Sequence, residues 1–312
     1  MFCNLVHATQ PAQITPLAFN SLMTDVASAK QQVIAVGEQG HILYSKNNGL
    51  HWAQATVPVD NLLTSISMLN ESTAWAVGHD GVVLKTVDGG ESWILLYSMF
   101  QASGAEFVDP LLDVTFWTEK DGLIVGAFGQ LYRTKDGGHN WVDLRTELPN
   151  EDELHLNSVM RNADQSIWIA SEYGSLFYSE DDGQTWQLKT LPSDGTFFSL
   201  SYDAASREII AAGITGNCFS VSRDTYKAKQ VPLRSTQSIY DVDIWDGKLH
   251  LVGSNGTWQA GQEIKIDYNR VNRHAITQTQ SGDFIIATAQ GVQAFSATAQ
   301  AIKLVYKIEE NK

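Results

Sequence analysis

Short apolar runs alternate with polar turns along this chain, and seven of the runs end at a four-residue loop that closes on a glycine. A second apolar run follows each loop. Glycine adopts a positive φ without a Cβ clash, so such a loop predicts a tight hairpin between two strands. The loops recur every 35 to 48 residues, a period typical of propeller blades. The closing glycines are Gly40, Gly81, Gly129, Gly174, Gly216, Gly256 and Gly291.

Two further β-like segments flank the hairpins. The one before the hairpin is clearest at residues 62–69, 111–117, 154–160, 197–202 and 238–245. The other follows the hairpin after a turn and begins with an aromatic residue. Four antiparallel strands per unit define a blade, so the pattern predicts an all-β, seven-bladed β-propeller of four-stranded antiparallel blades over residues 17–312. We interpret residues 1–16 as an N-terminal segment that is either a signal-peptide remnant or an extra strand.

A second motif, S/T-x-D-x-G-x-x-W, occupies the turn after four of the hairpins, at residues 45–52, 86–93, 134–141 and 179–186. A short carboxylate or amide accepts hydrogen bonds from its own turn, and the indole packs back between sheets. These turns lack the alternating ligands of a calcium loop, so we interpret them as structural. Their key residues are Asn47, Trp52, Asp88, Trp93, Asp136, Trp141, Asp181 and Trp186.

The combined pattern VG-x-x-G-x(4)-T-x-D-G-G-x-x-W, complete at residues 77–93, resembles the repeat of the photosystem II stability/assembly factor family. The resemblance extends over about residues 20–300, within the wider class of BNR or Asp-box propellers that includes sialidases. It implies a seven-bladed propeller exported to the periplasm or the thylakoid lumen. It also implies a non-enzymatic scaffold that binds a protein partner and helps to assemble or stabilise a membrane protein complex.

Charge and composition narrow the set of partners. The net charge is −14, and an acidic surface repels phosphate backbones, so we expect no nucleic-acid partner. The eight histidines are scattered without metal-ligand spacing, and we expect no metal and no cofactor. The apolar runs are far too short to span a membrane. We therefore expect a monomer that does not itself cross the membrane.

Catalytic motifs known from this class of propellers do not match. A sialidase binds its substrate carboxylate with three arginines, the first of them within an Arg-Ile-Pro motif in the first blade. Here the first arginine of the chain is Arg133, in the third unit, and that motif does not occur. We therefore predict a protein that is not an enzyme. A glycan-binding propeller remains the alternative, and a glycoside hydrolase with an unfamiliar site is the weaker one.

Binding is expected on the face opposite the Asp-box turns. The hairpin loops keep their glycines there but differ in the residues between, and the longest links between units emerge on the same side. An apolar insertion beside an acidic one suits a protein-binding rim. We predict Phe100, Phe107, Phe128 and Tyr173 as apolar anchors, with Glu151 and Glu153 steering a basic partner. Alternatively, Phe100 and Phe107 cover blade edges, and Phe128 and Tyr173 stack on a glycan.

Overall fold

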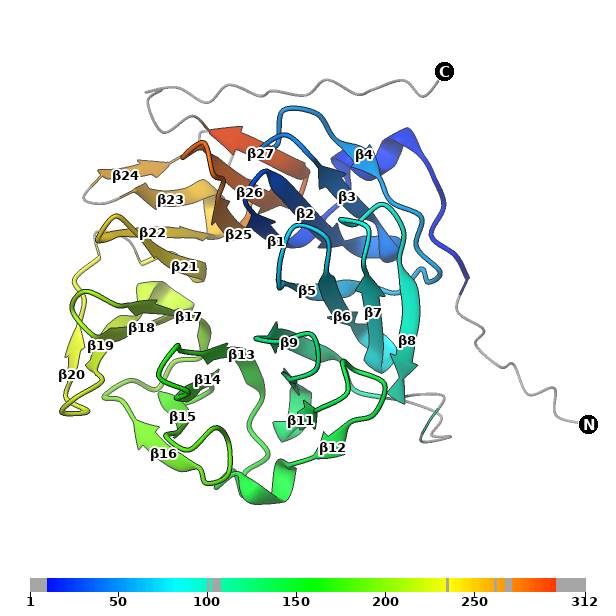
Figure 1. Ribbon diagram of the computed structural model, residues 1–312. Helices are drawn as coiled ribbons and strands as arrows, with labels where there is room; N and C mark the ends of the chain where they lie inside the picture. The colour runs from blue at the N-terminus through cyan, green and yellow to red at the C-terminus, as the bar shows by residue number, and fades with distance from the viewer. Residues whose placement is uncertain are drawn as a thin grey trace, which may run out of the picture.

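A computed structural model describes residues 10–99, 102, 108–233, 236–260, 263–266 and 271–295 of the chain. Antiparallel sheets stand around a central axis like the blades of a propeller (Figure 1). Strand order within each sheet follows the sequence, from the axis outward. Residues 10–15 form no strand.

Six of the sheets are four-stranded blades, each made of consecutive strands. The first three are β1 (Met23–Ala29), β2 (Gln32–Gly37), β3 (Ile42–Ser45) and β4 (Ala53–Gln54); β5 (Leu63–Met68), β6 (Ala74–Gly78), β7 (Val82–Thr86) and β8 (Ile94–Ser98); and β9 (Leu111–Phe116), β10 (Gly122–Gly126), β11 (Leu131–Thr134) and β12 (Val142–Asp143). The next three are β13 (Leu156–Arg161), β14 (Ile167–Ser171), β15 (Ser175–Ser179) and β16 (Gln187–Thr190); β17 (Phe197–Asp203), β18 (Glu208–Gly213), β19 (Cys218–Ser222) and β20 (Ala228–Gln230); and β21 (Ile239–Trp245), β22 (Lys248–Gly253), β23 (Thr257–Ala260) and β24 (Glu263–Ile266).

Seven short 3₁₀ turns accompany the strands in the described residues. They are η1 (Pro16–Asn20), η2 (Glu38–Gly40), η3 (His79–Gly81), η4 (Ala127–Gly129), η5 (Arg145–Glu147), η6 (Ile214–Gly216) and η7 (Ser254–Gly256). All except η1 and η5 are hairpin loops between the second and third strands of a blade.

The prediction of seven four-stranded blades is wrong, because the structure has six such blades. Within the described residues, the last sheet contains three strands, β25 (Arg273–Gln278), β26 (Phe284–Thr288) and β27 (Gly291–Phe295). Its hairpin follows the repeat, but no Asp-box turn follows Ser296 to begin a fourth strand, and residues 296–312 lie outside the described residues. The repeat of the hairpin therefore overstated the number of complete blades.

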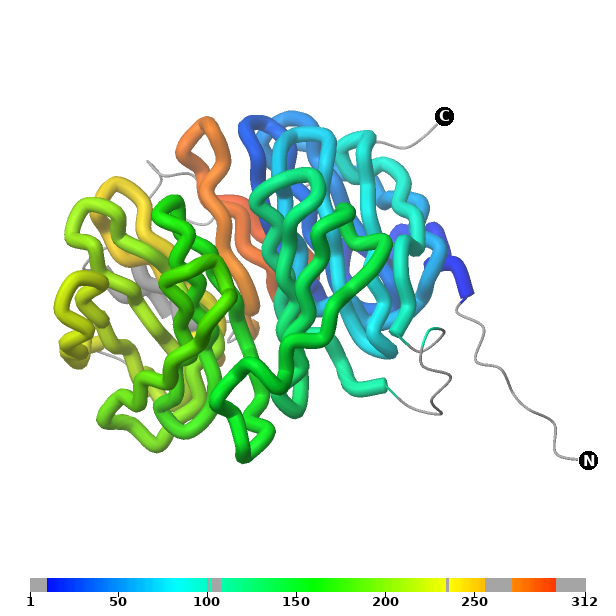
Figure 2. The backbone as a smooth tube through the Cα atoms, turned by 60° about the horizontal axis from the view of Figure 1, so that its bottom comes forward, coloured from blue at the N-terminus to red at the C-terminus, as the bar shows by residue number. Residues whose placement is uncertain are grey.

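The innermost strand of each sheet contacts the innermost strand of the next. This series runs from β1 through β5, β9, β13, β17 and β21 to β25, and β25 contacts β1. Apolar residues of adjacent sheets pack together between them, as where Met23 and Val33 share a cluster with Ala275 and Ile285 of the three-stranded sheet. Figure 2 shows the sheets side by side around the ring. The hydrophobic core is therefore divided among the interfaces between sheets.

Hydrogen bonds define two faces of the ring. On one, the hairpin loops bond to the links between blades, as in Gly40 N–H to Asn61 O and Ala127 N–H to Pro110 O. We call this the loop face. On the other, the Asp-box turns bond to the turns between first and second strands, as in Gly137 N–H to Lys120 O. We call this the box face.

The four Asp-box turns share the backbone hydrogen bonds to the box side chain, and in the first three the tryptophan indole also donates to a glycine carbonyl. In the third blade, the Thr134 hydroxyl donates to the Asp136 carboxylate at 2.9 Å, and the backbone N–H of Asn140 donates to the same oxygen at 2.9 Å. The indole Nε1 of Trp141 donates to Gly138 O at 3.0 Å. These bonds occupy the box acid within its own turn, which supports the structural interpretation of the motif.

Candidate functional site

Six hairpin loops on the loop face each present one non-glycine residue at the tip in the left-handed region, with φ between 52° and 56°. In the first five blades the glycine that follows the tip is also at positive φ. The tip side chains thus project from a backbone that is fixed by the loop and by its hydrogen bonds to the link. The tip residues are Gln39, Asp80, Phe128, Tyr173, Thr215 and Asn255.

Two of these tips are large aromatic residues on neighbouring blades. Phe128 of the third blade is 50% exposed, and Tyr173 of the fourth blade is 66% exposed. The Phe128 ring lies 4.7 Å from the His155 ring, centroid to centroid. The backbone N–H of His155 donates to Glu172 beside Tyr173, at 2.9 Å. The link between the two blades therefore contacts the Phe128 tip and the hairpin loop that carries Tyr173.

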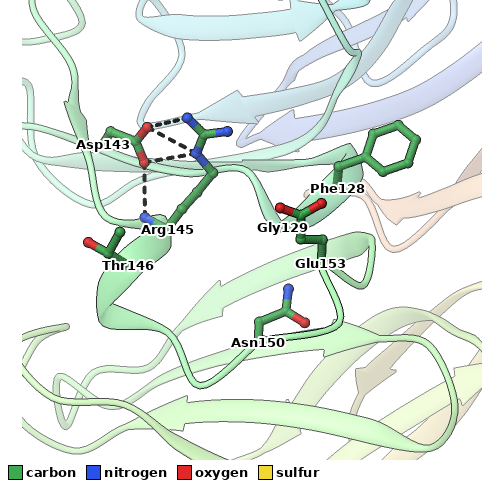
Figure 3. Close-up of a pocket in the computed structure, with 7 residues that line it drawn as sticks. All are labelled: Phe128, Gly129, Asp143, Arg145, Thr146, Asn150 and Glu153. Atoms are coloured by element: carbon green, nitrogen blue, oxygen red, sulfur yellow. Dashed lines mark hydrogen bonds and ion pairs between the residues drawn. The ribbon is translucent and has the colours of Figure 1, made fainter.

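A pocket of about 490 Å³ opens beside Phe128 (Figure 3). The hairpin loop supplies one side of it, and the end of β12 with the link to β13 supplies the other. Arg145 and Asp143 form a bidentate ion pair, with Nη2 to Oδ2 at 2.6 Å and Nε to Oδ2 at 2.9 Å. The lining residues are Phe128, Gly129, Asp143, Arg145, Thr146, Asn150 and Glu153.

The turn that carries Glu153 is closed by Asn150. The Asn150 side chain donates to Leu154 O and accepts from Leu154 N–H, both at 3.0 Å, and Glu153 N–H donates to Asn150 O at 3.2 Å. Glu153 itself has a φ of 50°. Space here is tight, since a Cβ on Gly129 would lie 2.8 Å from the Asn150 Nδ2 atom. Loop and link therefore fit closely, and glycine is required at position 129.

The predicted binding residues fall into three groups. Phe128 and Glu153 line the same pocket, whereas Tyr173 and Glu151 lie exposed on the same face without lining it. Phe100 and Phe107 lie outside the described residues. Sequence reasoning missed the pocket residues Arg145 and Asn150. The dense polar composition of the link was the available signal, but it did not indicate which of its side chains line the pocket beside Phe128.

Partly buried carboxylates lie on the inner strands around the axis. Burial raises the pKa of Asp241 to about 7 and that of Asp113 to about 6, and it also raises the pKa of Asp25. Each accepts hydrogen bonds from backbone N–H groups, including one from the next sheet. A second pocket, of about 440 Å³, includes Asp241 and Asp243 together with residues of β13 and β17. The hydrogen bonds from the backbone of the next sheet hold Asp25, Asp113 and Asp241 between neighbouring sheets.

The described residues contain no group of three or more histidine, cysteine, aspartate or glutamate side chains placed to hold a metal ion. They also contain no helix long and apolar enough to cross a membrane.

Comparison with curated proteins gives a photosystem II assembly protein as a relative. The chain is 26% identical over 221 residues to the photosystem II assembly protein Ycf48 of Synechococcus sp. (strain JA-3-3Ab), covering 70% of this chain and 61% of that relative. It thus spans less than two thirds of that relative's length. The relative is named for assembly and not for an enzymatic reaction.

Solved structures share the fold at low identity. YCF48 bound to a D1 peptide superposes with a TM-score of 0.71 at 18% identity, covering 94% of this chain and 100% of that one. YCF48 from Cyanidioschyzon merolae gives 0.70 at 18% identity, with the same coverage. The family model described as photosynthesis system II assembly factor YCF48 matches residues 6–105 and 95–279, most of the chain. This protein therefore belongs to the YCF48 family of photosystem II assembly factors.

Proposed function

We propose that this protein is a non-enzymatic scaffold that binds a protein partner through its loop face and takes part in assembling or stabilising a membrane protein complex. Membership of the YCF48 family supports this role. The structural relative bound to a D1 peptide supports a protein as the kind of ligand. The partner of the present chain is a subunit of such a complex, or a segment of one.

The exposure of Phe128 and Tyr173 is the observation that carries this proposal. Both rings project from left-handed loop tips on adjacent blades, 50% and 66% exposed. Aromatic residues in fixed positions are typical anchors of protein interfaces, because they bury much surface while losing little side-chain entropy. Within the described residues, neither hairpin loop forms a hydrogen bond to the side chain of Phe128 or Tyr173. These residues are therefore available to a partner.

The arrangement of arginines supports the absence of a sialidase-type reaction. Arg133, the first arginine of the chain, pairs with Asp182 at 2.6 Å, and Arg161 contacts the same carboxylate at 2.9 Å. Both guanidinium groups also lie over the Trp117 ring. They are thus committed to joining the third and fourth blades. Recognition of a substrate carboxylate would need such groups free in a cleft.

An exported location is part of the same proposal, since the family resemblance implies the periplasm or a comparable compartment. Fractionation of cells that express the protein with a C-terminal tag tests it. The proposal expects the tagged chain in the periplasmic fraction, whereas retention with cytoplasmic markers would contradict it.

Affinity capture from a membrane extract tests the binding role. We compare the wild type with the double variant Phe128→Ala/Tyr173→Ala, using Leu50→Ala/Val87→Ala as a matched control that removes two exposed apolar residues from the box face. The double variant should bind the captured partner at least about tenfold more weakly while the control binds normally. Equal binding by all three would exclude the loop face.

A sugar test separates the glycan alternative. A ligand that binds only the folded state raises the melting temperature. Cello-oligosaccharides, xyloglucan oligosaccharides and sialyllactose should leave the melting temperature of the wild type unchanged at millimolar concentration. A sugar-dependent rise that Tyr173→Ala abolishes would favour the glycan-binding role instead.

A further inference from the structure

We propose that the pocket beside Phe128 receives a lysine or arginine side chain from a basic segment of the partner. This inference rests on the proposed function and adds the chemistry of recognition. Phe128 supplies an aromatic surface for the aliphatic stem, and Glu153 supplies the negative charge for the cationic head. Both residues line the same pocket (Figure 3).

Acidic side chains dominate the loop face among the described residues. The described residues of its hairpin loops and links include one arginine, Arg145, and no lysine. Most other lysines and arginines of the described residues that form ion pairs do so at the box face, as Lys46 does with Glu91. The loop-face acids are Glu38, Asp60, Asp80, Asp109, Glu147, Glu151, Asp152, Glu153, Glu172 and Asp194. A basic partner is therefore drawn to this face, over the first four blades.

Within the pocket, Asp143 pairs with Arg145, and Glu153 is the carboxylate outside that ion pair, although its charge also acts on the Arg145 guanidinium. The Arg145 guanidinium is already held by Asp143 through three contacts of 2.6 to 3.1 Å. Glu153 forms no ion pair within the part of the chain that the structure describes, and its side chain is exposed. The pocket therefore carries a net negative charge. An incoming acidic group would face Asp143 and Glu153 together.

The aromatic wall selects among cations. A guanidinium or ammonium group over an aromatic face is attracted by the ring quadrupole, and the stem of lysine or arginine packs against apolar surface. The His155 ring 4.7 Å from Phe128 restricts the orientation of that ring. An inorganic cation would gain nothing from Phe128, and a purely apolar side chain would leave Glu153 without a partner. A long basic side chain can contact the Phe128 ring with its stem and the Glu153 carboxylate with its charged head.

The pocket is also formed before binding. Phe128 and Glu153 sit at positive φ, in turns closed by the backbone and by Asn150. A preformed site loses little conformational entropy when it binds. This is why one exposed carboxylate suffices to contribute measurable affinity here.

The test uses a labelled peptide, Gly-Ser-Gly-Arg-Gly-Arg-Gly-Ser-Gly, and its citrulline counterpart, which keeps the size and shape of arginine without the charge. Fluorescence anisotropy with the full chain should show the arginine peptide binding and the citrulline peptide binding several-fold more weakly. Glu153→Gln should weaken arginine-peptide binding about three- to fivefold, in the range of an exposed charged pair. Phe128→Ala should weaken it by a similar factor.

Glu119→Gln is the matched control, because it makes the same chemical change at an exposed position on the box face. It should bind the arginine peptide like the wild type. Equal binding of the arginine and citrulline peptides, or equal behaviour of Glu153→Gln and Glu119→Gln, would overturn the proposal. If the captured natural partner is lost on Phe128→Ala/Tyr173→Ala but not weakened by Glu153→Gln, the basic-side-chain inference fails while the binding role stands.

Discussion

The carboxylate of Asp241 on β21 accepts a hydrogen bond from the backbone N–H of Ile276 on β25, with Oδ2 and N 2.9 Å apart. Two other inner strands repeat this contact at the corresponding position: Asp25 accepts from Ile66 at 2.8 Å, and Asp113 accepts from Val159 at 2.7 Å. Each acid reaches across to the next sheet. These bonds tie neighbouring sheets together next to the axis.

A first prediction concerns pH. The folded-state pKa of Asp241, about 7, lies above its unfolded value of 3.8 because burial disfavours the charge. The folded state therefore binds more protons between pH 4 and 7, and this acid lowers the free energy of unfolding as pH rises through that window. In Asp241→Asn, the free energy of unfolding should decrease less steeply as pH rises. Urea unfolding at pH 4.5 to 8 measures this free energy for the wild type and the variant.

The comparison with the variant is essential, because the pKa values of His41, His250 and His274 are lowered by burial. These neutral histidines gain stability with rising pH over part of the same range. Asp194→Asn, a change on the exposed loop face, should leave the pH profile as in the wild type. Parallel profiles for the wild type and Asp241→Asn would contradict the assignment.

The second prediction concerns the Asp-box tryptophans. Trp93 is 4% exposed, and its indole donates to Gly90 O at 3.2 Å. Trp93→Ala should lower the free energy of unfolding by about 3–5 kcal/mol, the range for deleting a buried aromatic residue. Trp141→Ala should lower it less, because Trp141 is only partly buried. Denaturant titration measures both, and a wild-type midpoint for Trp93→Ala would refute the structural role.

Third, the box acids stabilise the protein in the opposite pH range. Hydrogen bonds from Asn140 lower the pKa of Asp136 to about 2, below its unfolded value of 3.8. The stabilisation is therefore present above pH 4 and lost as pH falls toward 2. Asp136→Ala should lower the free energy of unfolding at pH 7 by about 1–2 kcal/mol. Near pH 2 the difference from the wild type should shrink, and a constant difference at both pH values would show that charge plays no part.

Fourth, the positive φ at the loop tips lowers the stability of the fold while it exposes the tip side chains. Thr215 is β-branched and exposed with a φ of 55°, a conformation that is costly for such a residue. Thr215→Gly should raise the free energy of unfolding by about 0.5–1 kcal/mol, after allowing for the greater chain entropy of glycine. Asn255→Gly should gain less, because asparagine tolerates this region. Thermal unfolding compares the two, and a destabilised Thr215→Gly would exclude strain at the tip.

Sequence patterns predicted the hairpins well because their cause is local. Glycine at the end of each loop follows from the positive φ that the turn needs, and the loops around Gly81 and Gly129 have the expected geometry. The number of complete blades was overstated for the same reason. A hairpin repeat reports two strands, and the described part of the last sheet ends at β27, with no Asp-box motif after it in the sequence.

Features that depend on the closed ring could not be predicted. Asp113 and Asp241 alternate with apolar residues on their strands, as solvent-facing acids would, and only the ring turns them inward against the next sheet. The pocket beside Phe128 likewise depends on how the link folds back, so Arg145 and Asn150 were not singled out. The position of these acids and the shape of this pocket both depend on contacts between sheets and links that are distant in the sequence, and not on local propensity.

The junction of β1 and β25 has a kinetic consequence. Ser28 and Thr277 share a hydrogen bond of 2.9 Å across it, although 249 positions separate them in the chain. Contacts this distant in sequence incur the largest loop-closure entropy and form slowly. The first blade therefore leaves the ribosome long before its last neighbour exists, and one flank of β1 stays uncovered throughout synthesis. Closing the ring is the step at which an unfinished chain is most exposed to aggregation.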